Sequence, residues 1–521
     1  MIYLDDLLAA TGGRLVGEAA AREFAGFCYD SRRVQAGELF VAIKTDRGDG
    51  HDYIAHAVQD GAAGVLCQSP PELDGFGRTC IVVPDTQAAL SDWGRYVIRK
   101  YRPQVIGITG STGKTNTREA IAAVLATRYS VFRNPANYNG RFGLPIALGG
   151  LGPQHQVAVL ELACDSFGEI AHLADLAAPR VGVVTAVSHA HLAYLDSLER
   201  IAEEKGRLIE ALPPDGVAIL NYDDARVREM AERTSARVIT YGLSPDADLV
   251  ASDMRPDAEG LRLMLHFAGA GGLGLPGYPT KAEVRTRLIG CHHAYTVLAA
   301  VAAGLVHGVP WEDILDALEE LRPSPGRLNV LGGVGGAVLL DDTYSANPQS
   351  MVAGLRALAD YPGQRRIAVL GGMAQLGGYA LEGHQQVAEA AASFVDLLVT
   401  LGERGAWIAD AAQKAGLPAN RVQVAYTAAD AARCLSERLG PGDVVLIKGD
   451  IDARMEQVAR LLLADAERDG PELVRQEPGW ERVRVTRPER PTWVDIDLEA
   501  VAYNVRQVKE IVGPDVAIMA V

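Results

Sequence analysis

Residues 104–129 read QVIGITGSTGKTNTREAIAAVLATRY. An apolar, β-branched run over 104–109 precedes a glycine-rich turn, and an Ala-rich helical pattern follows over 117–129. In such a unit the glycines let backbone N–H groups approach phosphate oxygens, and the start of the helix favours negative charge. The spacing is GxxGKT rather than GxxxxGKT, so the alternative is a chance Gly-Lys-Thr in a surface turn. The predicted phosphate loop comprises Gly110, Ser111, Thr112, Gly113, Lys114 and Thr115, with Lys114 on the outer phosphates and Thr115 on Mg²⁺.

The same alternation of apolar runs and helical stretches continues along the chain. Examples of the runs are VAVLELA, RVGVVTAV, RIAVLGG and VVLIKG. This pattern predicts α/β domains with parallel sheets, and a chain of 521 residues predicts about three of them. Breaks near Tyr101–Pro103 and Arg322–Gly326, and a charged, Pro-bearing stretch from Glu467, indicate the boundaries. The predicted parts are domains 1–100, 101–322 and 323–466, a linker 467–490 and a short piece 491–521.

Composition excludes several classes of function. Lys and Arg number 50 and Asp and Glu 66, so the net charge is −16, which disfavours binding to nucleic acid or to an anionic membrane. The six cysteines are scattered without metal-binding spacing, which favours reduced core thiols. There is no basic segment before an apolar run at the N-terminus, and no run of about 20 apolar residues. We therefore expect a cytoplasmic protein with no nucleic-acid and no membrane partner, in which any phosphate is held by a local site.

Charged residues near later strands are candidates for a metal site. Glu161 ends the strand VAVLELA, at the sheet edge where ligands gather, although alone it could be a surface carboxylate. His189 and His191 follow the next strand, and such a loop pair is more often solvent-facing than metal-binding. Lys205 falls on the apolar face of the helix 201–212. It either reaches out to the edge of that face, or lies near an anionic site, or is carbamylated into a metal-binding carboxylate.

Two aspartates stand at a strand end further along the chain. Asp341 and Asp342 follow the run AVLL and precede TYSANPQS. A corner of this kind can bind a ligand. The alternative is a capping turn at the start of a helix.

Together these stretches resemble the Mur ligases, the ATP-dependent amide-forming enzymes of peptidoglycan synthesis. The resemblance covers about residues 1–465. The motif of this chain has the form DxYxANPxSM, which is similar to that of the family member that adds D-Ala-D-Ala. It implies a three-domain α/β architecture: a uridine-nucleotide domain, a central P-loop ATPase domain and a C-terminal Rossmann-like domain. It also implies that UDP-MurNAc-tripeptide and D-Ala-D-Ala are joined through an acyl phosphate, with ATP and Mg²⁺. The motifs, in chain order, are YDSRRVQAGELF, ITGSTGKTNT, ELACDSFGEI, HAHLAYLDSLERIAEEKGRL, SPGRLNVL, LLDDTYSANPQSM, LGGMAQLGG and VLIKGDIDARMEQV.

The resemblance implies roles for single residues. Lys114 and Thr115 would hold ATP phosphates and Mg²⁺, while Glu161 would bridge two Mg²⁺ ions. His191 and a carbamylated Lys205 would hold the second ion, which completes the catalytic set. Nucleotide contacts are implied for Asn137, Asn139, Thr296, Arg327 and Asp342, and substrate contacts for Asp30, Ser31, Arg32 and Asn347.

The chain departs from the family pattern on the adenine and acceptor sides. Thr296 stands where the family has an adenine-side Asn, and Gly372 and Gln375 replace acidic residues. Asp450 and Ile451 follow Lys-Gly where the family has Ser-Arg. Two further hypotheses therefore stay open: a Mur-like ligase for another carboxylate and amine, and a weak ligase that is a scaffold for an attached racemase.

Residues 491–521 resemble the beginning of a second family, alanine racemase. In that family the lysine that carries pyridoxal phosphate comes directly after the strand "MAV". We therefore expect a piece of a longer bifunctional ligase–racemase, dimeric through its racemase part. Pyridoxal phosphate would belong to that longer protein, and we expect no racemase activity from this chain.

Overall fold

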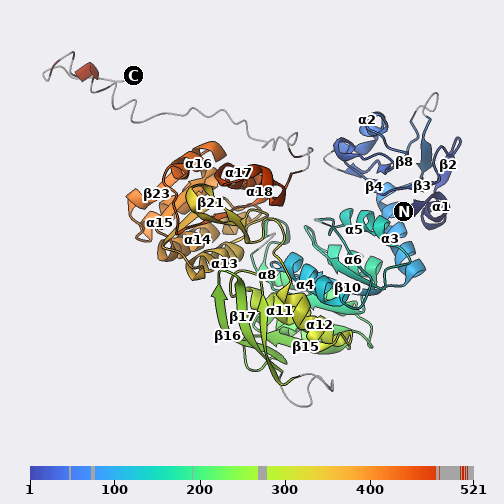
Figure 1. The fold of residues 1–521 in the computed structure, drawn as a ribbon. Helices are drawn as coiled ribbons and strands as arrows, with labels where there is room; N and C mark the ends of the chain where they lie inside the picture. The colour runs from blue at the N-terminus through green and yellow to red at the C-terminus, as the bar shows by residue number, and fades with distance from the viewer. Residues whose placement is uncertain are drawn as a thin grey trace. The chain divides into compact units, whose positions relative to one another are not determined.

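The computed structural model describes residues 1–45, 48–71, 77–135, 137–189, 192–267 and 279–476, with residues 480, 505, 507–509, 511 and 513 (Figure 1). The chain divides into two compact units, Met1–Gly479 and Trp480–Val521. The first unit contains three large sheets and two two-stranded ones, β1 (Ile2–Tyr3) with β3 (Glu23–Phe24) and β6 (Lys44–Thr45) with β7 (Gly48–Asp49). Most of the predicted piece 491–521 lies outside the described residues. Among the described helices, none has the length and apolar character needed to cross a membrane.

The N-terminal sheet has five strands in the order β2-β9-β8-β5-β4. All its pairs are parallel except the edge pair of β2 and β9. The apolar faces of its helices bury residues such as Leu4, Ile54 and Trp93. The strands are β2 (Arg14–Val16), β4 (Phe27–Cys28), β5 (Leu39–Val41), β8 (Gly64–Cys67) and β9 (Thr79–Val82), and the helices are α1 (Leu4–Thr11), α2 (Ile54–Gln59) and α3 (Thr86–Tyr101).

The central sheet carries the predicted phosphate loop. Its nine strands lie in the order β11-β12-β10-β13-β14-β15-β16-β17-β18, and the last two pairs are antiparallel. The strands are β10 (Gln104–Thr109), β11 (Val131–Arg133), β12 (Val157–Glu161), β13 (Val181–Val184), β14 (Val217–Asn221), β15 (Arg237–Gly242), β16 (Leu249–Asp257), β17 (Gly260–Phe267) and β18 (Lys281–Thr286). The main helices are α4 (Lys114–Ala126), α6 (Glu169–Ala177), α8 (Leu198–Glu210), α11 (His293–Val306) and α12 (Trp311–Glu319), with shorter α5 (Gly143–Ala147), α7 (Leu192–Leu195) and α9 (Ala225–Arg228).

Helices cover both faces of this sheet. Helix α4 packs on one face of β10, beside α11, which packs on β14, β15 and β16, and helices α6 and α8 pack on the other face of β10 (Figure 1). Strands β12 and β13 flank β10, with the chain running from β10 to β11 on one side and from β13 to β14 on the other. Ligands of open α/β sheets bind outside the carboxyl ends of strands where the connections diverge in this way. The loops after β10, β12 and β13 therefore meet at the edge where a site is expected.

The C-terminal sheet has six strands in the order β19-β20-β24-β21-β22-β23, all parallel except the edge pair of β19 and β20. Each face has its own core cluster. The strands are β19 (Asn329–Gly332), β20 (Val338–Asp342), β21 (Arg365–Gly371), β22 (Leu397–Leu401), β23 (Val422–Ala425) and β24 (Asp443–Lys448). The helices are α13 (Pro348–Asp360), α14 (Ala380–Phe394), α15 (Gly402–Lys414), α16 (Ala428–Ser436), α17 (Glu456–Leu462) and α18 (Ala466–Asp469).

The start of the predicted linker is folded. Helix α18 and the turn Gly470–Glu472 lead to Leu473 and Val474, whose exposed fractions are 3% and 7%. Leu473 belongs to the core cluster on one face of the C-terminal sheet. The start of the predicted linker 467–490 is therefore folded onto the C-terminal domain, with Leu473 and Val474 buried within a charged stretch.

Candidate active site

The loop after β10 has the backbone of a phosphate-binding turn. Gly110 and Gly113 have φ values of 148° and 81°, in the region that favours glycine. A Cβ on Gly110 would lie 1.9 Å from the Thr185 hydroxyl oxygen, so the close approach requires glycine. The Thr185 Oγ1 donates to the carbonyl oxygen of Thr112 at 2.6 Å, which fixes the loop against the end of β13. Helix α4 begins at Lys114, three residues before the predicted start, because the left-handed Gly113 turns directly into it.

The loop lysine is turned back onto its own loop. The Lys114 Nζ donates to the carbonyl oxygen of Gly110 at 2.8 Å. Burial, with the positive charge of Lys205, lowers the pKa of Lys114 to about 8, against the opposing effect of the negative charge of Glu161. A desolvated ammonium held by one carbonyl can exchange that partner for a phosphate oxygen, which carries a full charge.

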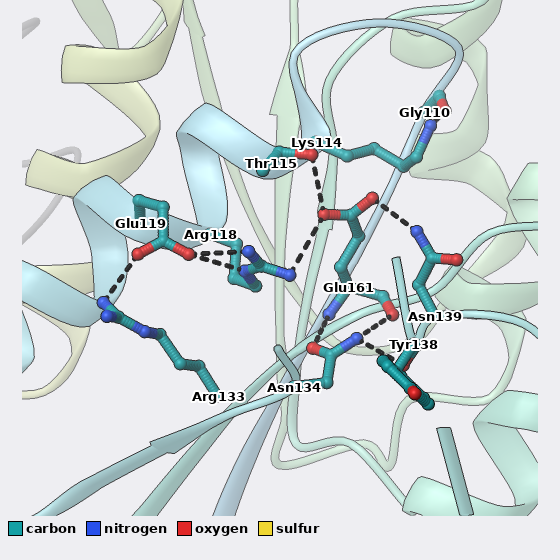
Figure 2. A network of polar contacts seen from close by, with 10 residues as sticks. All are labelled: Gly110, Lys114, Thr115, Arg118, Glu119, Arg133, Asn134, Tyr138, Asn139 and Glu161. Carbon is teal, nitrogen blue, oxygen red and sulfur yellow. Dashed lines mark hydrogen bonds and ion pairs between the residues drawn. The ribbon is translucent and has the colours of Figure 1, made fainter. Parts of the chain in front are cut away.

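Glu161 is the centre of the polar network in Figure 2. The side chain is 3% exposed, at the end of β12. The Thr115 Oγ1 donates to Oε2 at 3.0 Å, and the Asn139 Nδ2 donates to Oε1 at 2.8 Å. The Asn134 side chain pairs with both the N–H and the C=O of Glu161, at 2.9 and 3.1 Å. The predicted residues Thr115, Asn139 and Glu161 are thus brought together.

Arg118 is a member of this network that the sequence did not indicate. Its guanidinium is buried, with Nη1 3.5 Å from the Glu161 Oε2 and Nη2 2.6 Å from the Glu119 Oε1 (Figure 2). Arg133 approaches the other oxygen of Glu119 at 2.6 Å. The available signal was helical spacing, since Arg118 lies four residues after Lys114 and three after Thr115, on the same side of α4.

Lys205 is buried, as its place on the apolar face predicts. It is 2% exposed, and its Nζ lies 3.9 Å from the Cys164 Sγ. The alternative in which this side chain reaches the edge of the face is therefore wrong. The neighbouring Glu204 is fully buried and accepts from the N–H groups of Gly168 and Ile170 at 2.7 and 2.6 Å. An ammonium beside a thiol is poorly compensated, so the surroundings of Lys205 suit an anionic ligand or a modification.

The predicted metal set is only partly visible. His191 lies outside the described residues, whereas the ring of His189 stacks on Tyr379 with centroids 4.0 Å apart. Within the part of the chain that the structure describes, no group of three or more His, Cys, Asp or Glu side chains is placed to hold a metal ion. Of the predicted ligands, Thr115 and Glu161 are in direct contact.

In the C-terminal domain, Arg327 and Asp342 are linked through Ser345 and Lys448. The Arg327 Nη1 donates to the Ser345 Oγ at 3.1 Å, and its charge also lowers the pKa of Lys114. The Lys448 Nζ lies 2.7 Å from the Asp342 Oδ2 and donates to the carbonyl oxygen of Ser345 at 3.0 Å. Asp342 and Lys448 are both buried. Ser345 thus lies between the two predicted nucleotide contacts.

Other predicted residues lie outside the Glu161 network. Asn137 is exposed, and Thr296 is buried on α11, with its hydroxyl 3.4 Å from the Nδ1 of His293. The Asn347 side chain caps α13 by accepting from the Ser350 N–H at 2.8 Å. No contact between these side chains and the network is present among the described residues.

The predicted uridine-side residues form a local pair. The Asp30 carboxylate accepts from the Arg32 Nε and Nη2, both at 2.8 Å. Ser31 is buried at the start of the same turn. This bidentate pair fixes the turn and leaves Arg32 half-exposed.

Comparisons with known proteins agree with this architecture. Residues 23–97 match the family model for the Mur ligase family, catalytic domain, residues 108–304 the Mur ligase middle domain, and residues 326–451 the Mur ligase, glutamate ligase domain. The chain is 36% identical over 442 residues to the UDP-N-acetylmuramoyl-tripeptide–D-alanyl-D-alanine ligase of Synechocystis sp., covering 84% of this chain and 92% of that relative. It is 31% identical over 440 residues to the protein of the same name in Escherichia coli, covering 83% and 92%.

Solved structures show the same likeness. A crystal structure of MurF from Acinetobacter baumannii superposes with a TM-score of 0.76 at 27% identity, covering 88% of this chain and 97% of that one. The MurF ligase of Thermotoga maritima in complex with ADP superposes with a TM-score of 0.72 at 26% identity, covering 87% and 100%. The three-domain α/β architecture is therefore the one expected, and this chain is an ATP-dependent ligase that belongs to the Mur ligase family.

Proposed function

We propose that this ligase joins D-Ala-D-Ala to UDP-MurNAc-tripeptide in the synthesis of peptidoglycan. The names of the Synechocystis and Escherichia coli relatives support this pair of substrates. The observation that carries the proposal is the convergence of four side chains, Lys114, Thr115, Asn139 and Glu161, at the carboxyl ends of β10 and β12 (Figure 2). Domain 1–100 would bind the uridine nucleotide, domain 101–322 would bind ATP, and domain 323–466 would close over the ATP.

The loop and the C-terminal corner would hold the nucleotide between them. Lys114 would exchange the Gly110 carbonyl for the outer phosphates of ATP. Arg327 and Asp342 would contact the nucleotide, with Asn137 and Thr296 as further contacts on the central domain. The Arg327 Nε is buried and has no hydrogen-bond partner among the described residues, as expected of a donor that binds a ligand.

The residues present fit magnesium. Thr115 and Glu161 supply a hydroxyl and a carboxylate in contact, and Mg²⁺ prefers oxygen ligands. We propose that His191 and a carbamylated Lys205 complete the set. The ammonium would first lose a proton, and the neutral amine would then add CO₂ and release a second proton, so that an anion replaces a buried cation. When bound, Mg²⁺ would offset negative charge on the phosphates.

The reaction then needs no side-chain nucleophile. The terminal carboxylate of the tripeptide attacks the γ-phosphorus of ATP, which breaks the bond to the β-phosphate oxygen and releases ADP. The amine of D-Ala-D-Ala attacks the acyl phosphate, so an amide forms and phosphate and a proton leave. Water would hydrolyse the acyl phosphate, and enclosure by the domains would prevent this. Asp30, Ser31, Arg32 and Asn347 would bind the peptide substrate.

The test is detection of the product by mass after incubation with ATP, Mg²⁺, UDP-MurNAc-tripeptide and D-Ala-D-Ala. The variants K114A and E161Q should release ADP at least about a hundredfold more slowly, since each removes a group proposed to hold phosphate or metal. The control K414A changes a lysine that is 75% exposed and paired with Asp410, and it should keep full activity. Full carboxylate-dependent ADP release by K114A would exclude this site.

A second candidate is a Mur-like ligase for a different carboxylate and amine. It is favoured by the loop after β21, where Gly372 and Gln375 replace acidic residues of the family pattern. The Asp450 Oδ2 accepts from the Ala374 N–H at 3.0 Å. This loop is therefore hydrogen-bonded to Asp450, which itself differs from the family pattern. A panel of amines with ADP release as readout separates the candidates, and activity on D-Ala-D-Ala alone eliminates the second. Absence of turnover on any pair would instead favour the scaffold hypothesis.

We propose that residues 491–521 are the beginning of an alanine racemase, on sequence likeness alone. The matched family regions end at residue 451, so they give this piece no support. An encoding frame that continues past Val521 into a lysine would favour the proposal. A stop codon there would exclude it.

A further inference from the structure

Residues 473–475 pack against the chain around Gly326 and Tyr344, next to the proposed nucleotide contact Arg327. Leu473 and Val474 are buried, although they lie in a charged stretch. A Cβ built on Gly326 would lie 2.8 Å from a methyl carbon of Val474, so this segment touches the residue that precedes Arg327. Residues 473–475, here called the strap, therefore pack against the backbone next to Arg327.

Arg475 fastens the strap to the chain after β20. Its side chain is 5% exposed, and Nη1 donates to the carbonyl oxygen of Thr343 at 3.1 Å, while Nη2 donates to that of Tyr344. The same Nη1 lies 2.9 Å from the Oε2 of Glu456, a carboxylate that is 3% exposed. These donors are directed at backbone oxygens, so they fix the position of residues 343–344 as well as balancing a charge.

The ring of Tyr344 lies against two guanidinium groups. Arg327 lies 4.3 Å from the ring centroid and Arg475 lies 5.7 Å from it. Burial raises the pKa of Tyr344, Arg327 and Arg475 both lower it, and Glu161 also raises it. The phenol is therefore within electrostatic reach of the carboxylate at the end of β12.

The backbone at Arg475 supports a specific positioning role. Its φ is 59°, in the left-handed region that a residue with a side chain rarely adopts. Such a conformation persists only where surrounding contacts hold it, and it concentrates near functional sites. Here the contacts are those with Thr343, Tyr344 and Glu456.

We infer that Arg475 is a positioning residue for the nucleotide: it holds Tyr344, the ring on which the Arg327 guanidinium lies. Tyr344 and the Ser345 hydroxyl then fix the plane of Arg327, and its unpartnered Nε points to a place for a phosphate or ribose oxygen. The inference rests on the proposed function, in which Arg327 contacts ATP.

The test compares the full-length variants R475A, R475K and R327A. We expect R475A to raise the KM for ATP about tenfold, with kcat and the KM for the uridine-linked peptide within about twofold. R475K should recover part of the loss, because an ammonium can still reach one carbonyl and Glu456. Calorimetric binding of the β,γ-imido analogue of ATP with Mg²⁺ gives the same comparison without turnover, and should weaken by the same factor.

The matched control is R468A, which removes an arginine of the preceding helix that is 69% exposed and paired with Asp469. It should leave every constant unchanged. If R475A unfolds, E456Q tests the same support with a smaller change, and it should raise the KM for ATP about threefold. Should R327A weaken nucleotide binding while R475A and E456Q fold and bind normally, the inference is wrong and the proposed function stands. If R327A binds the nucleotide normally, Arg327 does not contact it, and the inference about Arg475 is wrong as well.

Discussion

Arg118 shows how a buried charge can be both structural and close to chemistry. Its guanidinium compensates two carboxylates, Glu119 and Glu161, in a place from which water is largely excluded. Removing one member of a buried ionic group leaves the others uncompensated, which costs more than the pair contributes. Arg118 therefore partly neutralises the negative charge of Glu119 and Glu161 when no metal ion is bound.

The variant R118A should lower the free energy of unfolding by about 3 kcal/mol, because Glu119 and Glu161 lose their shared partner. Thermal melting of the ligand-free protein measures this loss. R128A changes an arginine on the exposed side, 52% accessible and paired with Asp313, and should shift the melting temperature little. Adding E161Q to R118A should restore part of the stability. A double variant no more stable than R118A would contradict the coupling.

Asp341 gives a prediction about pH. Burial, with the negative charge of Asp342, raises its pKa from 3.8 to about 6, against the opposing effect of donation from the Thr343 hydroxyl and the Gly326 N–H. The folded state thus binds a proton that the unfolded state releases between about pH 4 and 6. This contribution to stability is complete below pH 4 and is lost as the pH rises through 6.

We therefore expect D341N to remove that pH dependence. The wild-type protein should lose on the order of 2 kcal/mol of stability relative to D341N between pH 4 and 7. Melting of both proteins across this range measures the difference, which subtracts the titration of all other groups. D410N, at a carboxylate that is 68% exposed, should follow the wild type throughout. A constant difference between D341N and wild type would show that Asp341 ionises normally.

Among the elements, helix α6 depends on a residue from another helix. Its N-cap, Gly168, has no side chain, and the buried carboxylate of Glu204 on α8 accepts from the N–H groups of Gly168 and Ile170 instead. E204A should cost about 3 kcal/mol, because the buried N–H of Ile170 and the N–H of Gly168 both lose a charged acceptor. E203A, one residue earlier and 48% exposed, is the matched control and should be near neutral. Equal melting temperatures for the two variants would refute the capping role.

The sequence predicted the central strands, which are buried on both of their faces. Strands β10, β12 and β13 lie between helices on both sides, so they read as unbroken apolar runs. Lys205 was predictable as buried for a related reason, since a helix face is fixed by spacing alone. The position of Glu161 at the carboxyl end of β12 was predictable, because the apolar run that forms the strand ends there.

What could not be predicted depends on contacts between distant elements. The pairing of Arg475 with Glu456, and of Glu204 with the start of α6, joins residues whose sequence surroundings look like ordinary solvated charge. Composition predicts a linker over the strap, because Leu473 and Val474 are outnumbered by charged neighbours in the sequence. Only tertiary packing shows which charges in such a stretch are buried.

At the scale of the whole molecule, an acidic chain builds a basic site. The net charge is −16, yet Lys205 and Arg327 both lower the pKa of Lys114, and Arg118 approaches the nearby Glu161. A triphosphate is therefore attracted at short range to one edge of the central sheet and repelled from the surface at large. This contrast favours a small anionic substrate over a polyanion such as nucleic acid.

The ligase itself extends as far as the strap. Residues Met1–Gly479 form one compact unit that includes the strap, so a chain ending at residue 479 should keep the melting temperature, kcat and KM for ATP of the full chain. A chain ending at residue 472 loses Leu473, Val474 and Arg475, and burial of the two apolar side chains alone contributes roughly 3 kcal/mol. It should melt earlier and bind ATP more weakly. The two truncations differ by seven residues, so removal of the distal piece is common to both and cannot cause the difference. Loss of activity already at 479 would instead mean that residues 480–521 contribute to catalysis, whatever their likeness to a racemase.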